Sequence, residues 1–235
     1  MRLNRQCHLF FVFLILAGLS VSGCQSEAAQ EETTSITYAN LFIRYIAPQA
    51  QLKATAAFRE GDSLSTAQPI EIPGGVKYQG QQLEKRRLPG QQVRYITDIR
   101  TAFSNPHRFQ FNGADGQAHE ITLELDPVDS FSVIGGSASL SEGMQLYIKN
   151  EQIEEGERIV LLFSDADNKA TTITLINPAV RDTFPIAGMR LRKLEPGPYN
   201  LYLVKKQHHE LDLDGVKATA DTEYYTAEQS FIITE

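Results

Sequence analysis

Short segments in which apolar and polar residues alternate recur from residue 36 to the end of the chain. A period of two places successive side chains on opposite faces of a strand, so each segment predicts a half-buried β-strand. In the first half, the predicted strands are residues 36–38, 41–46, 51–58, 76–78, 93–96, 109–111 and 121–125. The last two flank the sequence NGADG of residues 112–116, which predicts a β-hairpin.

The dipeptide Asp126-Pro127 interrupts this pattern, and a second series of segments follows it. Its predicted strands are residues 131–134, 144–149, 158–163, 171–176, 189–194, 199–204, 218–225 and 230–234. Turn signals such as Glu155-Gly156 and Asp214-Gly215 separate them. Strands spaced roughly 8–12 residues apart predict an all-β fold of sandwich type. No long amphipathic helix is predicted, and only residues 97–103 or 139–145 suit a helical turn.

The break at residue 126 predicts two β-sandwich domains, residues 36–126 and 127–235. Each has a length that domains commonly reach. Charge supports the division, because residues 36–126 carry ten basic and nine acidic residues, whereas residues 127–235 carry ten and seventeen. One continuous sandwich over both segments is the alternative.

One short motif resembles a corner found in known sandwich families. Residues 194–203 read LEPGPYNLYL, in which Pro and Gly turn the chain and Tyr199 is placed to pack at the corner. Leu201 and Leu203 then point into the core. The motif resembles the corresponding stretch of immunoglobulin-like and transthyretin-like domains. That resemblance implies an immunoglobulin-like architecture and carries no function.

The N-terminal residues have a different pattern. Arg2 and Arg5 precede an apolar run over residues 9–19, LFFVFLILAGL. A membrane-spanning helix needs about 20 apolar residues, so this run is too short to span a bilayer. A basic start, a short apolar run and small residues after it predict a secretory signal peptide over residues 1–23.

The signal peptide ends in Val21-Ser22-Gly23-Cys24, which resembles the lipobox of bacterial lipoproteins. The resemblance implies cleavage between Gly23 and Cys24, a diacylglycerol on the sulfur of Cys24 and acylation of its new amine. Three acyl chains would hold the protein at a membrane, because one chain alone binds only marginally. An ordinary secretory signal with an incidental cysteine is the alternative.

Residues 24–35 are polar and acidic and predict a flexible tether behind the lipid. By resemblance to proteobacterial lipoprotein sorting, Gln25 favours the outer membrane of the cell envelope. The acidic residues of the tether also resemble, loosely, a surface-export signal of some Bacteroidota lipoproteins, although a solvated tether is the preferred interpretation. Whether the protein faces the periplasm or the surface stays open.

Composition removes several classes of function. The only two cysteines are Cys7, within the predicted signal peptide, and Cys24, so a disulfide framework and a cysteine metal site are excluded from the body. The net charge is −7, which makes a nucleic-acid partner improbable. Motifs for a serine nucleophile, a phosphate loop or a zinc protease are missing, so no cofactor and no catalytic residue is predicted.

Two surfaces are candidate binding sites for a protein or a glycan. One is basic, with Lys85, Arg86 and Arg87 at its centre and Arg94, Arg100 and Arg108 further along the chain. Its expected partner is an anionic polysaccharide, a lipid head group or a protein. The other is aromatic, and it is a candidate because exposed tyrosines can stack on sugars or anchor a protein interface. It is formed by Tyr224 and Tyr225 together with Tyr199 and Tyr202. The simpler interpretation of the basic residues is a solvated loop and strand face. The simpler interpretation of the tyrosines is that they pack in the core.

Candidate metal ligands have simpler interpretations as well. Asp165 and Asp167 begin like a calcium loop, but Lys169 takes the next alternate position, so a hairpin turn is favoured. A shared site with Asp212 and Asp214 is possible only if the two loops converge. His208 and His209 would point to opposite faces of a strand, so a solvated hairpin end is the favoured interpretation of this pair. His107 and His119 flank the predicted hairpin without a spacing that brings them to one ion.

The sequence therefore predicts a non-enzymatic, lipid-anchored envelope protein whose β-sandwich body presents a binding or assembly surface to a protein or glycan. The alternative is a hydrolase of a cell-wall or extracellular polymer. Its two carboxylates could come from distant strands.

Overall fold

The computed structural model describes residues 35–113, 116–149, 152–176, 179–180 and 182–235. The predicted signal peptide, Cys24 and the tether up to residue 34 lie outside the described residues. Residues Thr34–Glu235 form one compact unit. The unit is built almost wholly from strands, which confirms the prediction of an all-β, sandwich-type fold.

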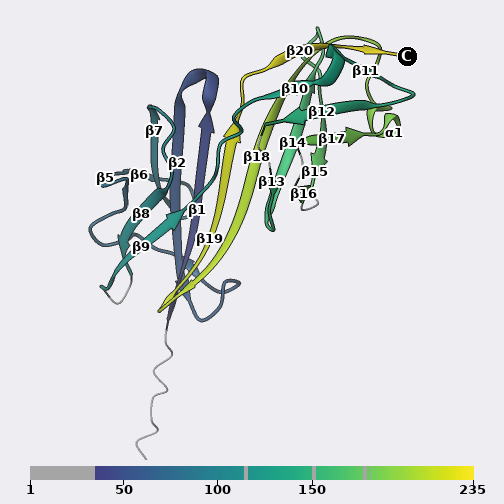
Figure 1. Ribbon diagram of the computed structural model, residues 1–235. Coiled ribbons are helices and arrows are strands. Elements are labelled where there is room, and N and C mark those ends of the chain that lie inside the picture. The colour runs from purple at the N-terminus through teal and green to yellow at the C-terminus, as the bar shows by residue number, and fades with distance from the viewer. Residues whose placement is uncertain (1–34, 114–115, 150–151, 177–178, 181) are drawn as a thin grey trace, which may run out of the picture. The chain divides into compact units, whose positions relative to one another are not determined.

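One large sheet runs through the unit (Figure 1). Its main path, in spatial order, is β11-β20-β18-β19-β1-β2-β7-β6, and β14, β15 and β3 pair beside it. The strands are β1 (Ile36–Ile46), β2 (Gln51–Gly61), β3 (Gln68–Pro69), β6 (Glu84–Arg87), β7 (Val93–Arg100), β11 (Ser137–Ser139), β14 (Glu157–Ser164), β15 (Ala170–Leu175), β18 (Gly197–Leu213), β19 (Val216–Tyr225) and β20 (Gln229–Thr234).

The long strand β18 joins the two halves of this sheet. Its first part pairs with β20 and β14, and its second part pairs with β19. β19 in turn pairs in parallel with β1, the first strand of the chain. Figure 1 shows β18 and β19 extending from the strands of the second half into those of the first.

A second sheet covers one face of β1, β2 and β7. It has the order β5-β4-β8-β9, formed by Gln81–Gln82, Lys77–Tyr78, His107–Asn112 and Ala118–Leu123. Between the sheets lies a first core that includes Leu41, Phe58 and Phe109. Full burial of each such side chain contributes about 1.5–3 kcal/mol relative to exposure. The pairing of β8 with β9 confirms the hairpin that the sequence predicts.

The first core also contains a buried histidine. His107 is fully buried, and its Nδ1 lies 2.6 Å from the hydroxyl oxygen of Tyr78. The Phe103 ring packs edge-on against the imidazole. Burial lowers the pKa of His107 to about 4, so the imidazole is neutral at pH 7. Its role is therefore that of a polar core residue.

A third sheet, with the order β10-β12-β17 (Phe131–Val133, Met144–Ile148 and Thr183–Ile186), encloses a second core against β14, β18 and β20. Leu201 and Leu203 are completely buried there, as the LEPGPYNLYL motif predicts. At the corner, the backbone N–H of Glu195 donates a hydrogen bond of 3.2 Å to the hydroxyl oxygen of Tyr199. The motif therefore turns the chain into β18.

A polar belt separates the two cores on the inner face of the large sheet. Lys205, Gln207 and His209 succeed one another on that face of β18, between Leu203 and Leu211. Lys205 and Glu157 form an ion pair of 3.4 Å with both side chains at least nine-tenths buried. This belt marks the change from one core to the other within a continuous strand.

The predicted boundary at residue 126 stays a prediction. The first core draws on residues 39–123, but it also takes Val216, Ala218 and Ala220 from β19. The first sandwich therefore needs the C-terminal hairpin of β18 and β19 to complete its sheet.

Three local predictions are wrong. Residues 189–194 were expected as a strand, but Gly188–Leu191 is the short helix α1. Gly188 approaches the backbone so closely that a Cβ there would lie 2.3 Å from the carbonyl oxygen of Leu140. The suggested helical turns at 97–103 and 139–145 also fail, because residues up to Arg100 continue β7 and Met144 begins β12.

Two further short strands, β13 (Gln152–Ile153) and β16 (Ala179–Val180), pair with each other.

Candidate binding groove

The outer face of the large sheet, opposite the first core, carries the candidate site. In the described part of the chain, the β5-β4-β8-β9 sheet packs only against the inner face. Alternation along the strands sends every second side chain of β1, β2, β7, β18 and β19 outward. The strand registers then place outward side chains from distant parts of the sequence in rows across the sheet.

Two neighbouring rows form the site. The first row crosses six paired strands through Arg86, Arg94, Ala57, Asn40, Thr219 and Glu210. The second row runs through Arg59, Tyr38, Lys217 and Asp212. Small side chains occupy the middle of the first row, whereas long side chains stand at its two ends. The centre of the face is therefore hollow.

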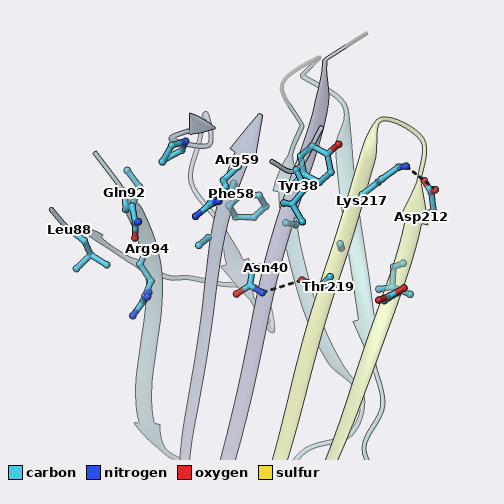
Figure 2. A pocket seen from close by; sticks show the side chains of 18 residues that line it. Tyr38, Asn40, Phe58, Arg59, Leu88, Gln92, Arg94, Asp212, Lys217 and Thr219 are labelled. Carbon is cyan, nitrogen blue, oxygen red and sulfur yellow. Dashed lines mark hydrogen bonds and ion pairs between the residues drawn. The ribbon is translucent and has the colours of Figure 1, made fainter. Parts of the chain in front are cut away.

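This hollow is a groove of about 770 Å³. Leu64 from the loop after β2, Pro69 from β3, and Leu88 and Gln92 from the β6–β7 connection contribute to its lining. In Figure 2, Arg59 and Arg94 stand on one side of the groove and Lys217 and Asp212 on the other. Tyr38 and Asn40 lie between them. The volume falls within the range of small-ligand sites, roughly 300–1,000 Å³.

Charges are distributed unequally across the groove. Arg59 and Arg94 are exposed, and among the described residues neither guanidinium has an ion-pair or hydrogen-bond partner. On the opposite side, Nζ of Lys217 lies 3.9 Å from Oδ2 of Asp212. At the centre, the side-chain amide of Asn40 donates a hydrogen bond of 3.1 Å to the hydroxyl oxygen of Thr219. The β2–β7 side is thus cationic and the β18 side acidic.

Further along the same face of the sheet, charged side chains form a network of ion pairs and hydrogen bonds. Arg44 and Lys206 both contact the carboxylate of Glu223, at 2.8 and 2.6 Å. Burial raises the pKa of Glu223, but the hydrogen bonds from Lys206 and Arg44 outweigh it and hold this pKa below its usual value. Tyr225 donates to the same carboxylate, and Arg44 lies over its ring. The network is internally satisfied, in contrast to Arg59 and Arg94.

The structure places the predicted tyrosines on opposite faces of β19. Tyr225 is half-buried on the outer face, in the network just described. Tyr224 faces inward and stacks on Tyr45, with ring centroids 5.7 Å apart. Of the other two tyrosines, Tyr199 is buried in the second core, and Tyr202 packs beside Tyr225.

The predicted basic residues Lys85, Arg86 and Arg87 form the edge strand β6. Lys85 and Arg87 contact Glu71, and Arg86 contacts Glu84 at 2.8 Å. Four strand spacings separate β6 from β19, which is about 19 Å. The basic and tyrosine candidates are therefore not brought into one site, and a binding role for either stays a prediction.

The candidate metal ligands do not meet. Asp165 accepts hydrogen bonds from the backbone N–H groups of Asp167 and Lys169 in the tight β14–β15 turn. Ser164 pairs with Asn200, and twelve further residues of β18, roughly 40 Å, lead to Asp212. Among the described residues, no group of three or more His, Cys, Asp or Glu side chains is placed to hold a metal ion.

The histidines are also separated. His208 faces outward, where its Nδ1 lies 2.8 Å from Asp221, whereas His209 lies on the inner face. His119 pairs with Phe111, four residues along β8 from His107, which corresponds to roughly 13 Å.

Comparison with known proteins does not assign the chain to a family. Neither a protein-family model nor a curated protein sequence matches the chain. In the part of the chain that the structure describes, no helix is long and apolar enough to cross a membrane.

Sequence reasoning missed most of the groove. Arg94 was noted only as part of the basic segment, and Tyr38, Asn40 and Arg59 were not singled out. The available signal was the alternation, which gives Tyr38 and Arg94 outward positions in predicted strands, whereas Asn40 and Arg59 each lie one residue outside the predicted bounds. Without the register between strands, that signal does not show which residues become neighbours.

Proposed function

We propose that this protein is a non-enzymatic, lipid-anchored protein of the bacterial cell envelope that binds a glycan or a protein in its outer-face groove. Acyl chains on Cys24 would hold it at a membrane, with the outer membrane favoured. The single observation that carries the binding role is the groove itself. It is a hollow of about 770 Å³, and the two arginines on one of its walls have no ion-pair partner among the residues that the structure describes.

The lining supports binding to a polar partner. Tyr38 offers an aromatic face with a polar tip, and Asn40 and Gln92 offer amide donors and acceptors. The floor consists of paired strands held by a core, so these groups are positioned before a partner arrives. Binding sites with a rigid scaffold lose little conformational entropy on association.

Filling the groove tests this proposal. Ala57 lies on the groove floor, and Ala57→Trp should block it without removing any of its charged groups. We expect residues 34–235, which form one compact unit, to sediment with purified bacterial envelopes, and we expect Ala57→Trp to lose at least tenfold in bound fraction.

Gln51→Trp is the matched control, because Gln51 lies on the same strand and face, six residues from Ala57 and outside the groove. It should sediment like the unmodified protein. If neither variant alters sedimentation, or if the unmodified protein does not bind envelopes, the groove is not the binding site.

A further inference from the structure

We infer that the groove selects an acidic glycan, with Arg59 and Arg94 binding a sugar carboxylate and Tyr38 and Asn40 contacting the sugar ring. This inference rests on the proposed binding function and names the chemical class of its ligand.

The two arginines are placed to act on one anionic group. Arg94 pairs directly with Ala57, and Arg59 follows two residues later on the same face of β2. Arg59 is therefore the diagonal neighbour of Arg94, about 7–8 Å away between Cα atoms, which long side chains can bridge. A guanidinium is suited to a carboxylate because its donors match the two oxygens in one plane.

Their charge is not used within the described part of the protein. Arg86, directly opposite Arg94, has Glu84 as a partner, and Arg44 has Glu223. Arg59 and Arg94 have no such carboxylate in the described ranges of the chain, although the whole sequence carries a net charge of −7. Acidic side chains are thus abundant but are not placed at these two guanidinium groups. An external anion is the natural partner.

The rest of the groove suits a polyhydroxylated ring. Tyr38 stands beside the arginines, and it is the aromatic side chain on the outward floor, in a protein that has no tryptophan. Asn40, Thr219 and Gln92 can exchange hydrogen bonds with hydroxyl groups. Asp212 and Glu210 on the far wall can accept from hydroxyls but repel a second carboxylate. The acid group is therefore directed to the β2–β7 side.

A peptide strand fits the groove less well than a glycan. Peptides that add to a sheet need a strand edge with unpaired N–H and C=O groups. The floor strands β1, β2 and β19 are each paired on both sides, so the floor offers side chains alone. A short oligosaccharide needs only such side-chain contacts.

A matched ligand pair tests the carboxylate. We would measure binding of residues 34–235 to an array of uronic-acid, sialic-acid and neutral oligosaccharides. Calorimetry would follow with tetragalacturonate and its methyl ester, which differ only at the carboxylates. The acid should bind at least tenfold more tightly than the ester. Arg59→Gln and Arg94→Gln should each weaken binding of the acid about tenfold, as expected for hydrogen bonds to a charged group.

Arg100→Gln is the control, because this substitution removes the same charge from the same face of β7 at a position outside the groove. It should leave binding of the acid unchanged. Equal binding of acidic and neutral sugars, no retention of any acidic sugar, or an equal loss in all three variants would overturn the inference. If Ala57→Trp still abolishes envelope binding in that case, the proposed function stands with a different ligand. If it does not, both fail.

Discussion

Replacing Cys24 with alanine is expected to move the protein out of the membrane fraction or to stop its maturation. The lipobox resemblance places all acyl chains on this residue, and each buried CH₂ contributes about 0.8 kcal/mol to membrane binding. Loss of three chains should therefore change partitioning almost completely. Fractionation of cells combined with labelling by a radioactive fatty acid measures both effects.

Cys7→Ala is the matched control, since Cys7 lies in the segment that signal cleavage would remove. It should leave partitioning and labelling unchanged. A Cys24→Ala protein that stays membrane-bound with undiminished fatty-acid label would show that the anchor is elsewhere.

The largest expected effect on stability follows from the ion pair in the polar belt. In Glu157→Leu, the ammonium group of Lys205 would stay in a site that is only 4% exposed, without its 3.4 Å partner. Removing one partner of a buried ion pair typically costs about 3–5 kcal/mol. We expect a loss of that size in the free energy of unfolding, measured by urea denaturation.

Two companion variants make this result specific. Lys205→Met combined with Glu157→Leu should recover most of the loss, because an apolar pair of similar volume needs no partner. Asp129→Asn breaks the exposed pair with Lys149 and should leave the free energy of unfolding nearly unchanged, because solvent screens exposed ion pairs. A loss below 1 kcal/mol in Glu157→Leu alone would mean that the buried pair of Lys205 and Glu157 does not stabilise the fold.

Local patterning predicts the strands of this protein well, because each half-buried strand alternates. β1, β2 and β19 follow that alternation, with the inward residue of almost every pair buried. The full length of β18 was not predictable from the pattern. The polar residues Gln207, His208 and His209 resemble the end of a hairpin, whereas they are the section of a 17-residue strand that crosses between two cores.

The joining of two sandwiches by one sheet also depends on pairings that no local pattern contains. β1 pairs with β19 across nearly the whole chain, with Asn40 opposite Thr219. The groove depends on this same pairing. Its two walls come from β2 and β7 on one side and from β18 and β19 on the other. Sequence alone therefore gave the character of each groove residue but not the assembly of the site.

Backbone amide chemical shifts of residues 34–235, recorded while solubilised envelope polymer is added, test the central claim most directly. The account predicts that the largest changes occur at outward residues of the groove, namely Tyr38, Asn40, Arg59, Arg94 and Thr219. Residues of the second core, such as Leu146 and Phe163, should hardly change. Changes confined to the second half of the protein, with none on the outer face of β1, β2 and β7, would contradict it.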